Sequence, residues 1–430
     1  MLNSHFSLIR PLALFAALFG VAAISSAQVT VGTASDKLTI SGEVRARAES
    51  RRNFDFNSLR DDENSFVFLR SRLGVRLDAT DDILAYIQLQ DARTFGDEPS
   101  TVNDDASVDL RQGWFEARKF FGSPVTIKVG RQELSYGSER LIGGVDWSNV
   151  GRSFDAVKLT VPVGTFSIDL FGSTIVESNA NDNDLGLYGL VGTWKSPSTT
   201  VMPYIFLKRD GRGNFVAERN KTDTGNLENY TAGLYWVWKV SDRLSVDAEG
   251  AYQFGNWSSD EIRAWAAHAG VSYRLTTKYA LTISGEGNWA TGDENSTDGK
   301  RESFDNLYPT NHKFYGYADF AQWNNAENYR IGLSMKPTAP MTLAVDYHFL
   351  RLDTTNDAWR NAGGGTVMAA RAFAGNRDLG RELDLLVKHK YDDHLEFLFG
   401  YSIFRMSQAN PASGLQENAQ FWYLQSRFHF

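Results

Sequence analysis

Residues 38–49 read Leu-Thr-Ile-Ser-Gly-Glu-Val-Arg-Ala-Arg-Ala-Glu, and this stretch decides the fold. Every even-numbered residue in it is apolar or small, and every odd-numbered residue is polar or charged. Successive side chains of a β-strand point to opposite faces of the sheet. The stretch therefore predicts a strand with one apolar face and one charged face.

The same alternation recurs along the chain, whereas a helical period of 3.6 residues is weak beyond the N-terminal segment. Several of the alternating segments reach ten or more residues, which is about the length that a tilted strand needs to cross a bilayer. We predict about 18 strands from this pattern. They lie near 38–49, 65–78, 82–93, 107–119, 124–135, 154–162, 165–175, 185–195, 201–209, 229–240, 243–255, 262–275, 279–291, 329–336, 341–352, 379–391, 394–406 and 420–430.

The connections between these strands alternate between long and short. The long ones are 50–64, 94–106, 136–153, 176–184, 210–228, 256–261, 292–328, 353–378 and 407–419. The short ones lie near 80–81, 122–123, 163–164, 197–198, 241–242, 276–278, 337–340 and 392–393. Bacterial outer-membrane barrels have this arrangement, and a soluble sandwich has no reason for it. We therefore predict an all-β fold: a transmembrane antiparallel β-barrel of about 18 strands, with short periplasmic turns and long extracellular loops.

The two ends of the chain agree with this fold. Residues 1–27 are typical of a secretory signal peptide, with the positive charge of Arg10, an apolar run over 11–24 and small residues before the expected cleavage. Roughly 14 apolar residues are too few to span a bilayer. The last strand ends in Phe430, which resembles the terminal signal of outer-membrane barrels. We assign 1–27 to a signal peptide and 28–430 to one barrel domain.

Composition excludes several kinds of site. The chain has no cysteine, so disulfides, thiolate nucleophiles and cysteine metal sites are excluded. Loss of Arg10 with the signal peptide lowers Lys plus Arg from 44 to 43 against 52 acids, a formal net charge near −9. The histidines lack zinc spacing, and no Gly-x-Ser-x-Gly motif is present. We expect no enzyme activity and no cofactor. The acidic segment 179–184 is interpreted as a solvated loop, with a calcium site as the alternative.

Five arginines share the polar phase of the first two predicted strands. They are Arg45, Arg47, Arg70, Arg72 and Arg76. A barrel of this size encloses water, and the polar phase of each strand faces it. The planar fork of arginine pairs with carboxylates and stays charged. We predict that these residues line the pore and attract anionic cargo; the alternative is that they pair with lumen acids and stiffen the wall.

Residues 125–158 form a second informative stretch, in which a Gly-rich, charged connection joins two alternating strands. Its motifs are Gly130-Arg131-Gln132-Glu133-Leu134-Ser135-Tyr136-Gly137, Arg140-Leu141-Ile142-Gly143, Asp146-Trp147-Ser148-Asn149 and Gly151-Arg152-Ser153-Phe154-Asp155. Further motifs lie at 304–316 and 380–385. Together, these motifs resemble the alginate-export family of bacterial outer-membrane porins.

The resemblance implies a barrel of roughly 18 strands whose lumen selects an acidic polysaccharide by means of arginines. Motif by motif, it points to Arg131, Arg140 and Arg152, with Glu133 and Asp155 as their partners. The exporter of that family has a long periplasmic loop before its last two strands. This chain has only a short turn at Asp392-Asp393.

We therefore predict an outer-membrane channel that exports an anionic polysaccharide such as alginate through an arginine-lined pore. The alternative is a general or oligosaccharide-uptake porin with little polymer selectivity. The expected partners are the anionic polysaccharide or oligosaccharide, outer-membrane lipid, and periplasmic secretion or uptake proteins. We expect a monomer that does not bind nucleic acid.

The connection 136–153 has a predicted position of its own. Four of its apolar side chains need cover, and its two arginines need anionic partners. The apolar residues are Leu141, Ile142, Val145 and Trp147, and the arginines are Arg140 and Arg152. We predict that this connection folds inward at the outer mouth of the barrel.

Overall fold

The computed structural model describes residues 30–31, 37–57, 59–102, 108–178, 183–372, 375–408 and 417–430. The predicted signal peptide and residues 179–182 of the acidic segment lie outside this part of the chain. None of the described helices is long and apolar enough to cross a membrane.

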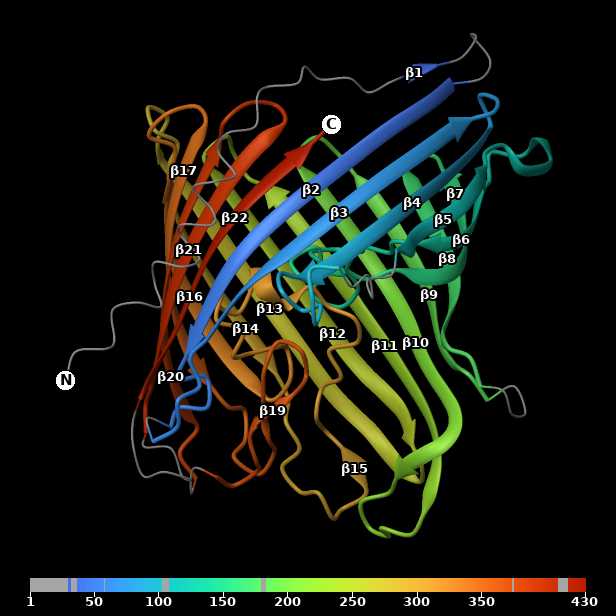
Figure 1. Cartoon of the computed structure of the whole chain (residues 1–430). Helices are drawn as coiled ribbons and strands as arrows, with labels where there is room; N and C mark the ends of the chain where they lie inside the picture. The colour runs from blue at the N-terminus through green and yellow to red at the C-terminus, as the bar shows by residue number, and fades with distance from the viewer. Residues whose placement is uncertain are drawn as a thin grey trace.

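Eighteen antiparallel strands form a closed barrel (Figure 1), because the last strand, β22 (Asn418–His429), pairs with β2 (Lys37–Arg52). Each of the other strands pairs with the barrel strand that precedes it and the one that follows it. They are β3 (Asn64–Asp78), β4 (Ile83–Thr94), β5 (Asp109–Ala117), β6 (Thr126–Gln132), β7 (Phe154–Val163), β8 (Phe166–Val176), β9 (Leu185–Lys195), β10 (Thr199–Val216), β11 (Thr224–Lys239), β12 (Leu244–Trp257), β13 (Asp260–Thr276), β14 (Leu281–Ala290), β16 (Ala326–Met335), β17 (Met341–Arg351), β20 (Asp378–Lys390) and β21 (Leu395–Met406). The predicted fold class is confirmed.

Short elements complete the described structure. β1 (Thr30–Val31) pairs with the start of β2, and β15 (Lys300–Arg301) lies parallel to the start of β13. The remaining elements are the hairpin β18 (Trp359–Arg360) and β19 (Thr366–Met368) and the two 3-10 turns η2 (Phe120–Gly122) and η3 (Asn311–Lys313).

The two phases of the strands have opposite environments. Ile87 and Ile331 in the apolar phase are 53% and 58% exposed, whereas Arg70 and Glu382 in the polar phase are fully buried inside the barrel. An apolar outer band of this kind is what a bilayer requires of a transmembrane barrel. The period-two pattern therefore encodes which side of the wall each residue occupies.

The short turns gather at the end of the barrel that holds the C-terminus, at the top of Figure 1, and the long loops gather at the opposite end. One of the predicted long connections, 256–261, is wrong. β12 and β13 stay paired as far as Trp257 and Asp260, so only Ser258 and Ser259 connect them. Ser258 takes a positive φ of 54°, which closes this tight turn.

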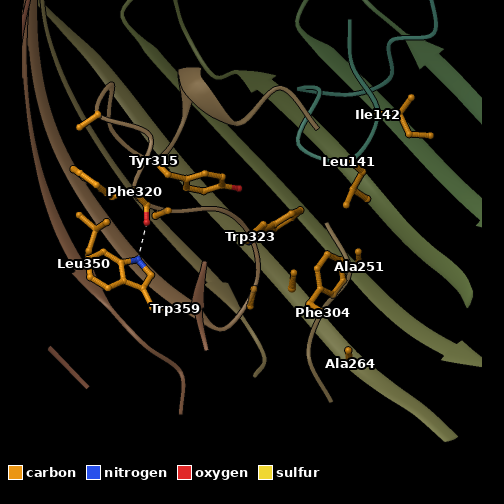
Figure 2. Close-up of a cluster of buried hydrophobic side chains, with 14 of the residues drawn as sticks. Leu141, Ile142, Ala251, Ala264, Phe304, Tyr315, Phe320, Trp323, Leu350 and Trp359 are labelled. Atoms are coloured by element: carbon orange, nitrogen blue, oxygen red, sulfur yellow. Dashed lines mark hydrogen bonds between the residues drawn. The ribbon is translucent and has the colours of Figure 1, made fainter. Parts of the chain in front are cut away.

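Three loops fold into the barrel and pack against one another. They are 133–153, 291–325 and 352–372, and the first two are drawn in teal and orange within the wall in Figure 1. Figure 2 shows the apolar core that they form, in which Ile142, Phe304 and Trp323 are fully buried. The indole Nε1 of Trp359 donates a hydrogen bond of 2.6 Å to the carbonyl of Phe320. Only the first of these loops was expected from the sequence to turn inward.

Candidate functional site

The loop 133–153 crosses the lumen from one wall to another. Near its start, the Ser138 hydroxyl donates to Glu249 of β12 at 2.8 Å. Further on, Asp146 accepts from arginines of β2 and β3, on a different part of the wall. The inward fold is confirmed. The crossing lies deeper than the outer mouth, because Arg45 and Arg70 stand near the middle of their strands.

The tip of this loop, residues 146–150, lies on four arginines that we call the arginine cluster: Arg45, Arg47, Arg70 and Arg72. Arg45 and Arg47 donate from Nη1 to the carbonyls of Asp146 and Trp147, each at 2.6 Å. Their neighbours on β3 bind the Asp146 carboxylate, with Nη2 of Arg70 at 2.9 Å and Nη1 of Arg72 at 3.1 Å. Four guanidinium groups thus converge on one short segment.

The Asp146 carboxylate is held as an anion. Burial raises its pKa, but the charges of Arg70, Arg427, Arg72 and Arg45 outweigh burial and lower the pKa to about 2. Its side chain is nevertheless 54% exposed, so it faces open lumen as well as the cluster. The arginine cluster therefore binds one side of the Asp146 carboxylate and leaves the other side open to water.

Acceptors in the barrel wall orient three of the cluster's side chains. The Nε atoms of Arg47, Arg70 and Arg72 each donate at 2.7 Å to a neighbouring wall residue. Those acceptors are Glu49, Glu43 and Gln90. Each guanidinium is anchored at Nε and directs its Nη atoms to the loop. The same three side chains therefore pair with acceptors of the wall and contact the loop tip.

Arg76 stands apart from the cluster. It pairs with Asp78 on its own strand at 2.8 Å, and its side chain is 43% exposed. Arg131 and Asp155 face each other on β6 and β7 and pair at 3.0 Å, both partly exposed. The structure thus places neither Arg76 nor Arg131 against the loop tip.

Glu133 pairs with a residue that sequence reasoning missed. Arg111 of β5 donates from Nη2 to Glu133 at 2.6 Å and from Nη1 to the Ser153 hydroxyl, so it holds both ends of the loop 133–153. Its strand has a bulge opposite Gln88 and Leu89, which disturbs the alternation that would have revealed its inward phase.

Arg427 is a second missed residue. It pairs with Glu43 at 2.5 Å and approaches Asp146 at 3.8 Å. Its polar phase in the last strand was a usable signal for an inward position.

Arg140 lies in the apolar part of the loop. Its guanidinium stands over the Phe314 ring at 3.9 Å, and its Nη2 lies 3.6 Å from the Glu286 carboxylate. It also comes within 3.4 Å of His268 Nε2. An anionic partner is thus present, but it is Glu286 and not Glu133 or Asp155, and an aromatic ring lies beside it.

Arg152 departs from the expectation of an anionic partner. Its Nη1 donates to the carbonyls of Gly143 at 3.0 Å and Pro309 at 2.9 Å, and to the carbonyl of Tyr308. Burial lowers the pKa of Arg152 to about 10. This arginine therefore connects the loops 133–153 and 291–325 through their backbones.

Two cavities flank the loop tip. The outer one, of about 660 Å³, lies between the loops that follow β2, β14 and β17, and its lining includes Arg51, Asp319 and Phe421. The inner one, of about 410 Å³, includes Arg72 and Arg427 in its lining. No group of three or more His, Asp or Glu side chains in the described part of the chain is arranged to hold a metal ion.

An aromatic pair lies between the two cavities. Trp147, next to Asp146, stacks on His312 with a ring separation of 3.7 Å. His312 Nδ1 in turn contacts the Asp319 carboxylate at 3.0 Å, and Tyr423 packs on Trp147 at 4.8 Å. The loop tip and the 312–319 segment therefore separate the outer from the inner cavity.

Comparison with solved structures supports the fold. The Pseudomonas aeruginosa proteins OccD3 (OpdP) and OccK11 (OpdR) superpose with TM-scores of 0.61 and 0.60 at 13% and 12% sequence identity. The alignments cover 95% and 92% of this chain, and 94% and 96% of those chains. At this identity the likeness concerns the fold alone. No curated protein matches the sequence.

The family comparison covers most of the chain. A family model described as alginate export matches residues 36–416, which include the barrel strands up to β21 and the loop 133–153. The chain therefore belongs to the alginate export family.

Proposed function

We propose that this protein is an outer-membrane channel that exports an anionic polysaccharide, with a polyuronate such as alginate as its cargo, past the arginine cluster. The observation that carries the proposal is the convergence of Arg45, Arg70 and Arg72 on Asp146 at mid-height in the barrel. Membership of the alginate export family supports the same class of cargo.

The contacts of Asp146 indicate how a cargo would bind. Its carboxylate occupies the position between Arg70 and Arg72 where a uronate carboxylate would bind in the same way. Charge-assisted hydrogen bonds of this type are strong and directional. A passing chain presents one carboxylate after another, so each can replace the previous one at the Nη atoms without a deep binding site.

The charges also act on ions that do not touch them. Charges that line a narrow path decide which ions enter it, and exposed charges act over about 10 Å at 0.1 M salt. The cluster should therefore make the channel anion-selective in dilute salt.

A second candidate function is a porin for short oligosaccharides, in the direction of uptake. It is favoured by the inward loops, whose core includes the fully buried Phe304 and Trp323 in the lumen. The cavities of about 660 and 410 Å³ suit short saccharides better than a continuous polymer path.

Planar-bilayer recordings test the proposed selectivity. We expect a reversal potential that indicates anion preference across a KCl gradient, and current block by uronate oligosaccharides but not by neutral oligosaccharides of equal length. A cation-selective channel, or equal block by both sugars, would contradict the proposal.

Deletion of the gene for this protein in its native bacterium distinguishes export from uptake. Export predicts that an anionic polymer accumulates in the periplasm of the deletion strain. Uptake predicts instead that the strain loses growth on uronate oligosaccharides while its surface polymer is unchanged.

A further inference from the structure

We propose that the outer cavity is a separate saccharide site that binds a carboxylated sugar at the outer mouth, with Arg60 as the residue that contacts the carboxylate. The class of ligand rests on the proposed function. The site itself is inferred from the residues that line the cavity, and none of these belongs to the arginine cluster.

Three loops build the cavity. They contribute residues 54–57 and Arg60, residues 317–320, and residues 361–363 and 366–368. Arg51 of β2 and Phe421 of β22 complete the lining. The volume of about 660 Å³ lies within the range of roughly 300–1,000 Å³ typical of small-molecule sites. Residues from distant parts of the chain thus form one hollow on the loop side of the barrel.

The aromatic side of the cavity is held in place by buried neighbours. Phe54 and Phe421 lie 6.3 Å apart, and Phe54 packs on Phe320 at 4.9 Å. Phe320 in turn contacts the fully buried Phe56 and Phe404 at 4.9 and 5.0 Å. Rings held in this way offer a preformed surface to the apolar C–H face of a sugar.

The two arginines of the cavity differ in their partners. Arg51 pairs with Glu49 at 2.9 Å, so its charge is offset within the wall. The exposed Arg60 side chain makes no hydrogen bond or ion pair with any residue in the described ranges. Its guanidinium is therefore available to a carboxylate, which it can bind through two parallel hydrogen bonds.

The acids of the cavity are engaged by protein donors. Asp319 contacts His312 Nδ1 through both carboxylate oxygens at 3.0 Å. Asp55 accepts the backbone N–H of Asn57 at 2.9 Å. These contacts reduce the repulsion that an incoming carboxylate would meet beside Arg60.

Asn361 is oriented to donate to a ligand. Its Oδ1 accepts the backbone N–H groups of Gly363 and Gly365 at 3.1 and 2.9 Å. Its Nδ2 has no acceptor among the residues that the structure describes. With the oxygen occupied, the free NH₂ group is a donor for a sugar hydroxyl or carboxylate.

The stacked rings of Trp147 and His312 separate the outer cavity from the arginine cluster. A ligand can therefore bind in the cavity without movement of the loop tip. Trp147 and His312 stack at 3.7 Å between this cavity and the arginine cluster. A sugar can therefore occupy the outer site while Asp146 stays on Arg70 and Arg72. We infer that the outer cavity holds the end of a saccharide at the mouth of the channel.

Isothermal titration calorimetry on the detergent-solubilised full chain tests this inference, with a uronate trisaccharide and a neutral trisaccharide as probes. We expect the uronate to bind more tightly than the neutral sugar. Arg60→Gln should weaken uronate binding about tenfold, the size expected for loss of one charge-assisted contact. Asn361→Asp keeps the acceptor oxygen for Gly363 and Gly365 but adds a negative charge, so it should weaken binding at least as much.

Arg52→Gln is the matched control. It removes the same charge one residue beyond Arg51, in the opposite strand phase and outside the lining of the cavity. It should leave the affinity within about twofold, because only a long-range and screened charge is lost. Circular dichroism should show the same strand content in all variants.

The outcomes separate this inference from the proposed function. Absence of uronate binding, equal affinity for the neutral sugar, or equal effects of Arg60→Gln and Arg52→Gln would overturn the outer site. A channel without anion selectivity that still binds uronate in an Arg60-dependent manner would overturn the proposed function and leave the outer site standing.

Discussion

The two arms of the loop 133–153 differ in the interactions that dominate their contacts: apolar burial in the first arm and charge in the second. In the first arm, Leu134, Leu141 and Ile142 are buried in the apolar core. Two backbone hydrogen bonds also hold this arm. The Tyr308 N–H donates to the carbonyl of Leu141 at 2.8 Å, and the Gly143 N–H donates to the carbonyl of Tyr308 at 2.9 Å. This arm is stabilised mainly by the apolar area that it removes from water.

The second arm, residues 146–150, is held by charge. Its carbonyl oxygens and one half-exposed carboxylate accept from the arginine cluster. Trp147 also stacks on His312, and Asn149 Nδ2 donates to the carbonyls of Leu69 and Arg93. A soluble anion can compete for the same Nη atoms. The first arm therefore fixes the loop, whereas the second arm is the part that an anionic cargo would displace under the proposed function.

Deletion of residues 137–149 removes most of both arms and should have the largest effect. We expect single-channel conductance in planar bilayers to rise about twofold or more, since the loop crosses the lumen from one part of the wall to another. Shortening the exposed outer segment 96–102 is the control and should change conductance little. Unchanged conductance in the deletion variant would place the loop outside the ion path.

Removal of two charges from the arginine cluster should have the next largest effect, on ion selectivity. Arg70→Gln combined with Arg72→Gln should abolish most of the anion preference, measured as reversal potential across a KCl gradient. Arg76→Gln combined with Arg131→Gln is the matched control, because it also removes two charges and both arginines pair with acids away from the loop tip. The contrast should fade near 1 M salt, where the screening length is about 3 Å. Equal effects of both variants would show that net charge, and not the cluster, controls selectivity.

Truncation of the apolar arm should act on stability more than on selectivity. Ile142 is fully buried, so Ile142→Ala should lower the free energy of unfolding by about 2–5 kcal/mol, measured by urea titration. Asp146→Asn in the charged arm is the comparison and should cost about 1 kcal/mol or less, since its side chain is half-exposed. If Asp146→Asn proved the more destabilising, the assignment of the two arms would be reversed.

A change of pH between 4 and 8 should have the smallest effect of all. The second arm should keep its contacts with the arginine cluster over this range. The pKa of Asp146 is lowered from 3.8 to about 2, so its ion pairs contribute stability above pH 3.8 and lose it as the pH falls through about 2. Reversal potentials should therefore be constant over this range. A change centred between pH 5 and pH 7 would mean that another group controls the position of the loop.

Much of the fold could be predicted because the relevant pattern is local. Alternation over residues 38–49 and 394–406 encodes the face of each strand without reference to any other segment. The inward phase of Arg45, Arg47, Arg70 and Arg72 follows from the same rule. The rule weakens where pairing is irregular, which is why the bulge beside Arg111 hid that residue. It also does not define loop lengths, as the tight turn at Ser258 shows.

The sequence by itself thus determined the barrel, its closed antiparallel wall, the side on which its charges stand and the inward turn of the loop 133–153. The partners of those charges became clear from the three-dimensional structure. Arg45 and the carbonyl of Asp146 are 101 residues apart, and Arg152 and that of Pro309 are 157 apart. No periodic pattern encodes such contacts, because they depend on how aperiodic loops pack inside the closed wall. The physical reason is that strand phase is set by neighbouring residues, whereas loop position is set by burial and charge pairing across the whole lumen.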